Sequence, residues 1–147
     1  MTQTMTGGCQ CGRVRYSVVL QNDDAYLCHC RMCQKATGGF AAAFVQVERA
    51  ALSWQSGPDW YQSSPIARRP FCSQCGTPLG FAFNDGEGAD LTVGSFDDPS
   101  GFVPTAHYGC EGLHEAWLDT HGLPRHESAT TESVADRWQA AGLEVPK

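Results

Sequence analysis

Short runs of alternating or β-branched apolar residues, separated by turn-forming clusters, recur along the chain. Residues 13–20 alternate between polar and apolar positions and then become β-branched, which is typical of a half-buried strand. Runs of the same kind predict strands at residues 40–47, 79–83, 91–96 and 103–108, with Gly, Pro, Asn and Asp clusters between them. The pattern therefore predicts a mainly β fold.

Helical signals are confined to two short segments. One predicted helix opens around Arg31–Thr37, and the other lies near Ser133–Ala141, where Ser133 is expected to cap the first turn. The polar stretch at residues 128–133 favours a loop before the second helix. We therefore expect residues 127–147 to form a loosely attached tail that includes this helix.

Length and composition indicate a globular protein. A chain of 147 residues fits one domain of ordinary size, so a single domain over residues 1–147 is expected. Hydrophobic residues make up 41% and charged residues 18%, which is too apolar for a disordered chain and too interrupted for a membrane span. The first residues carry no secretory pattern, so a cytoplasmic location is expected.

The charge is acidic and unevenly distributed. The formal net charge is −6, with seven Lys/Arg against four Asp/Glu in residues 1–75 and three against twelve in residues 76–147. Nucleic-acid binding requires clustered positive charge, which the chain as a whole lacks. We therefore expect neither nucleic acid nor membrane as a partner.

Seven of the eight cysteines fall into three tight groups. Clustered cysteines in a reducing compartment more often bind metal than form disulfides. The pair Cys9 and Cys11 can bind one ion from an extended segment, and Cys72 and Cys75 can do so from a tight turn followed by Gly76. The third group is Cys28, Cys30 and Cys33.

These groups divide most economically into four ligands and three. Tetrahedral zinc prefers four protein ligands in a structural site, and in a catalytic site it keeps three plus an open position. Joining Cys9 and Cys11 to Cys72 and Cys75 gives a closed structural site. The remaining triplet is then a three-thiolate site with a vacant position, where chemistry can take place.

Three other interpretations of the cysteines stay open. Disulfides would explain paired cysteines, although Cys-x-Cys is an awkward geometry for one. A second structural zinc site would result if Cys110 or a histidine completed the triplet. Cys72 and Cys75 alone would also fit a thioredoxin-like redox pair, but no βαβ pattern surrounds them.

The cysteine segments together resemble a known family. Their order and spacing are similar to those of the glutathione-dependent formaldehyde-activating enzyme family, also called the Gfa or centromere-protein-V-like family, in the segments Gly7–Gly12, Cys28–Gly38 and Phe71–Leu79. The likeness continues through His107, Tyr108, Glu111, Trp117 and residues 122–124, and it covers about residues 5–126.

The resemblance implies a β-tent zinc-binding fold with short helices, two zinc ions per chain and carbon–sulfur lyase activity. In this reaction formaldehyde and glutathione interconvert with S-hydroxymethylglutathione, so the implied partners are a small thiol and a small aldehyde or another small carbonyl compound. The matching structural ligands are Cys9, Cys11, Cys72 and Cys75, and the matching catalytic ligands are Cys28, Cys30 and Cys33. This partition agrees with the one favoured by spacing.

Several further residues are candidates for roles near the triplet. A three-thiolate site suits activation of a soft thiol nucleophile better than ionisation of water. His107 is a candidate for proton transfer or a structural residue, whereas His29 is expected to point away from the metal. Arg31 and Lys35 either attract a small anionic substrate or are solvated surface residues. The aromatic residues that either line a pocket or fill the core are Phe40, Phe44, Trp54, Trp60, Phe81 and Phe83.

Three classes of function compete at this stage. A zinc-dependent lyase needs an exchangeable coordination position beneath a pocket. A non-catalytic zinc-binding protein-interaction module needs a large exposed apolar patch. A zinc-thiolate redox sensor needs metal release when Cys28, Cys30 or Cys33 is oxidised.

Overall fold

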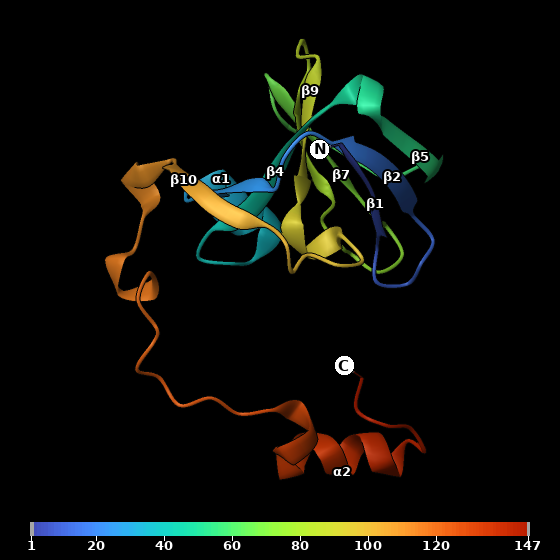
Figure 1. Cartoon of the computed structure of the whole chain (residues 1–147), viewed down its shortest axis with the longest axis vertical. Coiled ribbons are helices and arrows are strands. Elements are labelled where there is room, and N and C mark those ends of the chain that lie inside the picture. The colour runs from blue at the N-terminus through green and yellow to red at the C-terminus, as the bar shows by residue number, and fades with distance from the viewer. Residues whose placement is uncertain (1, 147) are drawn as a thin grey trace. The chain divides into compact units, whose positions relative to one another are not determined.

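The computed structural model describes residues 2–146 and divides the chain into two units, one up to Leu113 and one from His114 onward. Ten strands and two α-helices lie in the described residues, so the prediction of a mainly β fold with short helices is confirmed (Figure 1). All ten strands belong to the first unit. The expectation of a single domain over the whole chain stays a prediction.

Two sheets make up the first unit. The three-stranded sheet has the order β1-β2-β5, with bounds β1 (Gln3–Gly8), β2 (Arg15–Leu20) and β5 (Leu52–Ser56). The seven-stranded sheet has the order β10-β3-β4-β9-β8-β7-β6, with bounds β10 (Val103–Tyr108), β3 (Asp24–Cys28), β4 (Ala42–Glu48), β9 (Gly88–Thr92), β8 (Gly80–Phe83), β7 (Ala67–Phe71) and β6 (Asp59–Ser64).

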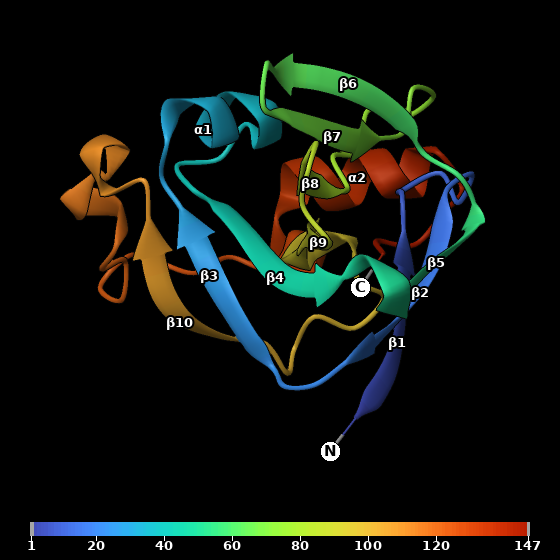
Figure 2. The ribbon, with the colours of Figure 1, turned by 90° about the horizontal axis from the view of Figure 1, so that it is seen from above.

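Strand pairing is antiparallel except at one edge. There β10 runs parallel to β3, with Tyr108 opposite Cys28 and a register shift between Pro104 and Ala106 (Figure 2). Because β10 comes late in the chain, this pairing brings the segment after Tyr108 beside the segment after Cys28. The edge strand thereby reaches the cysteine triplet.

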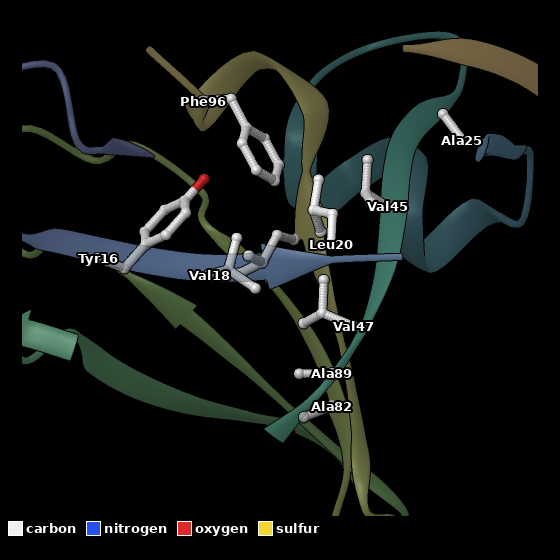
Figure 3. Packing of buried hydrophobic residues seen from close by; sticks show 10 residues of the cluster. Tyr16, Val18, Leu20, Ala25, Val45, Val47, Ala82, Ala89 and Phe96 are labelled. Atoms are coloured by element: carbon white, nitrogen blue, oxygen red, sulfur yellow. The ribbon is translucent and has the colours of Figure 1, made fainter. Parts of the chain in front are cut away.

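The main core lies between the two sheets' inner faces. On β2 the side chains of Tyr16, Val18 and Leu20 are buried at every second position, as the alternating pattern predicts. They pack with residues of β4 and with Phe96 (Figure 3). The Tyr16 hydroxyl and the Ser95 hydroxyl lie 2.9 Å apart and are hydrogen-bonded, so this buried polar group is satisfied.

Two smaller apolar clusters surround the cysteines. Cys9, Cys72, Val14 and Leu79 form one, and Cys33 packs with Ala42 and Phe44 in the other. Each group of cysteines is therefore embedded on one side in apolar side chains. Such surroundings strengthen electrostatic interactions with the thiols relative to water.

The two helices follow the prediction closely. Helix α1 (Arg31–Thr37) has the expected bounds, and α2 (Glu132–Ala140) begins one residue before the expected start. The role predicted for Ser133 is wrong, because the residue preceding α2 is Thr131, whose carbonyl accepts hydrogen bonds from the backbone N–H groups of Val134 and Ala135. The strand predicted at residues 91–96 ends at Thr92, because residues 93–95 form a 3₁₀ turn.

The second unit contains α2 and two 3₁₀ turns, at residues 115–117 and 128–130. None of the residues described in this unit is buried. No helix within residues 2–146 combines the length and the apolar character that crossing a bilayer demands. All the cysteines belong to the first unit.

Candidate metal centres

Four cysteines from two distant turns meet at one place. Cys9 and Cys11 follow β1, and Cys72 and Cys75 follow β7. Their sulfur atoms all lie within 4.8 Å of one another, with 3.5 Å between Cys9 and Cys11 and 3.8 Å between Cys11 and Cys72. The structure therefore brings together the two pairs that the spacing assigned to one site.

Each turn closes around a glycine with a left-handed backbone. Gly12 has a φ of 81° and its N–H donates to the carbonyl of Cys9 at 3.0 Å. Gly76 has a φ of 77° and its N–H donates to the carbonyl of Cys72 at 2.8 Å. Residues with a Cβ are strained in this region, so the glycines allow both cysteines of a pair to face one point.

Hydrogen-bond donors surround these four sulfurs. The backbone N–H of Val14 donates to Cys9 Sγ at 3.2 Å, and Arg13 Nε donates to Cys72 Sγ at 3.4 Å. Hydrogen bonds from the hydroxyl and backbone N–H of Thr77 lower the pKa of Cys75 to about 5. Burial raises the pKa of Cys72, but the bonds from Arg13 and from backbone N–H groups outweigh it. At Cys72 and Cys75 these donors favour the thiolate form that binds a metal. At Cys11 the backbone hydrogen bond from Arg13 lowers the pKa, but the neighbouring thiols outweigh it and raise the pKa to about 11.

The second cluster is local. Cys28 ends β3, Cys30 precedes α1 as its N-cap, and Cys33 lies in the first turn of α1. Their three sulfurs also lie within 4.8 Å of one another. The strand end and the helix start fix the triplet in place, because the backbone N–H of Cys33 donates to Cys30 Sγ at 3.4 Å.

The helix start also sets the ionisation of these thiols. Burial raises the pKa of Cys30, but N–H groups of Cys33 and Met32 donate to its sulfur, so its pKa lies below the ordinary value. Burial raises the pKa of Cys28 to about 12. Cys30 is thus the thiol of this group that the local backbone most favours as an anion.

One buried arginine contacts this triplet. Arg69 of β7 is only 7% exposed, and its Nη2 donates to Cys33 Sγ at 3.4 Å. Its guanidinium also lies 5.0 Å from the ring centre of Phe81. A positive charge held beside the sulfurs offsets the negative charge that three thiolates concentrate there.

A cavity of about 460 Å³ opens over the triplet, and the three cysteines form part of its wall. Arg69 and Asp90 are the charged residues of the lining. Burial raises the pKa of the Asp90 carboxyl, and its interaction with the Tyr26 hydroxyl opposes the increase. The aromatic residues of the wall are Tyr26, Phe44, Phe81, Phe83 and Tyr108.

The other aromatic candidates lie elsewhere. Trp54 packs edge-on against Tyr16 in the main core, at 5.5 Å between ring centres. Trp60 lies under the Arg68 guanidinium at 4.4 Å. Phe40 neighbours His29, with 6.1 Å between ring centres. Of the six aromatic residues considered from sequence, Phe44, Phe81 and Phe83 reach the cavity.

The histidines and the eighth cysteine do not join the triplet. Among residues 2–146, no fourth Cys, His, Asp or Glu ligand atom completes that group. His29 is fully buried, and its Nε2 lies 2.8 Å from Nδ1 of His107. Cys110 is exposed and its thiol contacts the carbonyl of His107 at 3.7 Å. His107 does not line the cavity, which favours its structural interpretation.

The loop after β10 packs directly on the triplet. Gly109 has a φ of 63°, and a Cβ at this position would lie 2.6 Å from the backbone nitrogen of Cys30. Gly112 accepts a hydrogen bond from the side chain of Gln34 at 2.9 Å. Only glycine permits the approach at residue 109, so this loop supports the cysteines without supplying a ligand.

The basic residues expected near the triplet are not part of its cavity. Arg31 is exposed and donates to the side chain of Gln34 at 2.5 Å. Lys35 lines a neighbouring cavity of about 500 Å³ on the side of α1, which shares Met32 and Arg69 with the cavity over the triplet. Sequence reasoning instead missed Arg69, Asp90 and Tyr26, whose only signal is their position on strands that neighbour the cysteine segments.

Fold and site together define a mainly β protein with two cysteine clusters that could hold metal ions. The sequence profile of the glutathione-dependent formaldehyde-activating enzyme family matches residues 4–112, and the chain belongs to this family. The match contains both clusters and ends before Trp117 and residues 122–124, to which the sequence resemblance extended.

Two individual proteins are similar to the chain. An uncharacterised lyase of Schizosaccharomyces pombe is 30% identical over 81 residues, which are 55% of this chain and 59% of that protein, so the matched region spans about three fifths of the relative. The crystal structure of a Rhodobacter sphaeroides protein, a structural genomics target, has a TM-score of 0.58 at 24% identity and covers 70% of this chain and 99% of that one. The latter likeness supports the fold.

Proposed function

We propose that the protein is a zinc-dependent carbon–sulfur lyase that forms or cleaves an adduct between glutathione, or a similar thiol, and formaldehyde or another small carbonyl compound. The observation that carries this proposal is the cavity of about 460 Å³ whose wall contains Cys28, Cys30 and Cys33. Family membership and the lyase-named relative support the reaction type. We also propose a cytoplasmic location, because glutathione keeps thiols reduced there.

The donor sets fit two zinc ions with different roles. Thiolates are soft ligands that favour zinc, and four of them close a tetrahedral shell. Cys9, Cys11, Cys72 and Cys75 would therefore hold a structural ion. Cys28, Cys30 and Cys33 would hold a catalytic ion and leave one position for an exogenous thiol.

The residues around the triplet have different roles in the proposed reaction. Zinc bound there would supply a position that favours the thiolate form of an incoming thiol. The apolar walls, including Phe44 and Phe81, limit the access of water to the reacting atoms. Arg69 holds a positive charge against Cys33 Sγ and so offsets the charge of the sulfurs. The three cysteines fix where the thiol sulfur meets the carbonyl carbon.

The reaction itself is a balanced addition. The thiol sulfur forms a bond to the carbonyl carbon, and the π electrons of the carbonyl move to its oxygen. The proton lost by the thiol ends on that oxygen, and cleavage runs the same steps in reverse. No oxidant or reductant is needed, so thiol, carbonyl compound and zinc account for all components.

Zinc stoichiometry followed by X-ray absorption tests the site. The reduced protein is expected to bind two zinc ions, and added glutathione should change the average non-protein ligation. The Cys110→Ser variant is the matched control, since this cysteine is exposed and outside both clusters. If each of the two ions is coordinated by four protein sulfurs, the triplet site has no open coordination position, and this result would favour a non-catalytic zinc module.

Exchange spectroscopy tests the reaction. NMR line shapes or magnetisation transfer between glutathione and S-hydroxymethylglutathione should show faster exchange with the zinc-loaded protein than with buffer. Cys30→Ser should abolish the acceleration, whereas Cys110→Ser should retain it. Equal exchange with and without the protein, across several small aldehydes, would refute the lyase proposal.

A further inference from the structure

The cavity over the triplet is much larger than formaldehyde requires. Its volume is about 460 Å³. Formaldehyde has only two non-hydrogen atoms and is comparable with one or two water molecules, each of which occupies about 30 Å³ in the liquid. Cavities of about 300–1,000 Å³ are typical of sites that enclose organic ligands of many atoms. Formaldehyde alone would thus fill only a small part of this space.

The walls are aromatic and arranged as packed pairs. Phe81 and Phe83 meet edge to face with ring centres 5.0 Å apart, and Tyr26 and Tyr108 meet in the same way at 5.1 Å. Phe44 is tilted against Tyr26 at 5.6 Å. Rings held by one another in this way form a preorganised apolar surface, which favours a planar or branched apolar group over a polar one.

The charges of the cavity disfavour carboxylates within it. Arg69 and Asp90 are the charged residues of its lining, and they carry opposite signs. Three thiolates with one bound divalent ion would carry a net charge of −1, which adds negative charge to the cavity. Arg69 already donates to Cys33 Sγ, so its charge is shared with the sulfurs. The two carboxylates of glutathione therefore suit the rim or solvent better than this interior.

We propose that the cavity binds the substituent of the carbonyl compound, and that the preferred substrates are neutral aldehydes with an aromatic or similarly large apolar group. This inference rests on the proposed lyase function and specifies its substrate class. The thiol adds to the aldehyde carbon, the new C–S bond forms as the C=O π bond opens, and the thiol proton passes to oxygen. The ring packs against Phe81 and Phe83, which line the cavity and are not buried, while the carbonyl carbon lies at the triplet.

A series of aldehydes tests the substrate class. With the zinc-loaded full chain and excess glutathione, kcat/KM is measured for formaldehyde, propanal, phenylacetaldehyde and anionic glyoxylate, each divided by its uncatalysed rate constant. The normalised value for phenylacetaldehyde should exceed that for formaldehyde by about tenfold to a hundredfold, as expected from burying one ring. Glyoxylate should be the poorest. A maximum at formaldehyde or glyoxylate would overturn the inference and leave the lyase function intact.

A binding measurement separates the cavity from the chemistry. Benzyl alcohol is neutral and unreactive, so ligand-observed NMR reports its binding even if no aldehyde is turned over. Gln46 lies on β4 and lines the cavity, whereas Glu48, two residues further on the same strand, does not. Both side chains are exposed, so Gln46→Phe and Glu48→Phe form a matched pair.

The expected outcomes are distinct. Parent protein and Glu48→Phe should bind benzyl alcohol, and Gln46→Phe should bind it at least about tenfold more weakly because the new ring occupies the cavity. If Gln46→Phe fails to fold, Ser64→Phe fills the same cavity from β6. No binding to the parent, or equal binding to the filled and control variants, would overturn the inference. Binding without turnover of any aldehyde would refute the lyase function alone.

Discussion

Arg69 Nη2 donates to Cys33 Sγ at 3.4 Å across 36 positions of sequence. The contact joins β7, which leads into the four-cysteine cluster, to α1, which carries part of the triplet. Its neighbour Arg68 instead lies over the ring of Trp60 at 4.4 Å. The two adjacent arginines on this strand thus contact different groups, because successive strand residues point to opposite faces of the sheet.

Replacing Arg69 should weaken metal binding at the triplet. Arg69→Met removes a buried positive charge and a hydrogen bond to a ligand sulfur while keeping a side chain of similar length. Loss of such a partner typically lowers metal affinity by about 10- to 100-fold. Chelator competition with zinc-loaded protein measures the change. Arg68→Met is the control, and equal affinities for the two variants would show that the Cys33 contact has no role in binding.

Cys30→Ser should remove one zinc ion per chain and leave the fold intact. Cys30 belongs to the local triplet, which begins α1 and does not join distant parts of the chain. Metal analysis by mass spectrometry should therefore fall from two equivalents to one, while the far-UV circular dichroism stays unchanged. Cys110→Ser should keep both ions. A Cys30→Ser protein that unfolds outright would place this cysteine in a structural site instead.

Local patterning accounts for the elements that sequence analysis placed well. Helix α1 and strand β10 have the predicted bounds, because their turn signals and apolar periodicity agree with their surroundings. Strand β6 was missed because half of its residues are exposed, none is buried, and they show no apolar alternation. Strand β7 was missed because a charged residue, Arg69, occupies a buried position and because Pro70 usually argues against a strand.

The site was predictable to the extent that its residues are close in sequence or follow a recognisable spacing. The cysteine clusters satisfy this condition, and the structure groups them as the spacing predicted. Arg69 and Asp90 do not satisfy it, because β7 and β9 carry them to the cavity and only the sheet order shows that. The positions of Arg69 and Asp90 depend on the register in which their strands pair, and this register cannot be inferred from single residues in the sequence.

Removing a ligand of the four-cysteine cluster should destabilise the first unit. The cluster ties the turn after β1 to the turn after β7, so a metal ion bound by it would contribute folding free energy. Cys11 is exposed, so Cys11→Ser creates no cavity and isolates the loss of the ligand. We expect a loss of at least about 3 kcal/mol in urea unfolding of the zinc-loaded protein. The difference should vanish when a chelator removes zinc from both proteins, and equal stability of Cys11→Ser and Cys110→Ser would contradict a structural site.

The ion pair between Arg15 and Asp97 should stabilise the protein in a pH-dependent way. Arg15 Nη1 donates to Asp97 Oδ1 at 2.8 Å and Thr6 Oγ1 donates to Oδ2 at 2.6 Å, so Arg15 first and then Thr6 lower the pKa of Asp97 from 3.8 to about 2. A carboxyl whose pKa is lowered by folding contributes its stabilisation above the unfolded pKa and loses it as the pH falls toward the folded value.

Asp97→Asn should therefore reduce stability at neutral pH and have little effect near pH 2. Because both side chains are more than a third exposed, solvent screening limits the contribution to about 1 kcal/mol. Urea unfolding at several pH values measures it, and the difference between parent and variant should shrink between pH 3.8 and pH 2, where Asp97 takes up its proton. Asp85→Asn, in the exposed turn after β8, controls for the general loss of a negative charge. A difference that stays constant down to pH 2 would show that the effect of the substitution does not come from the ionised pair.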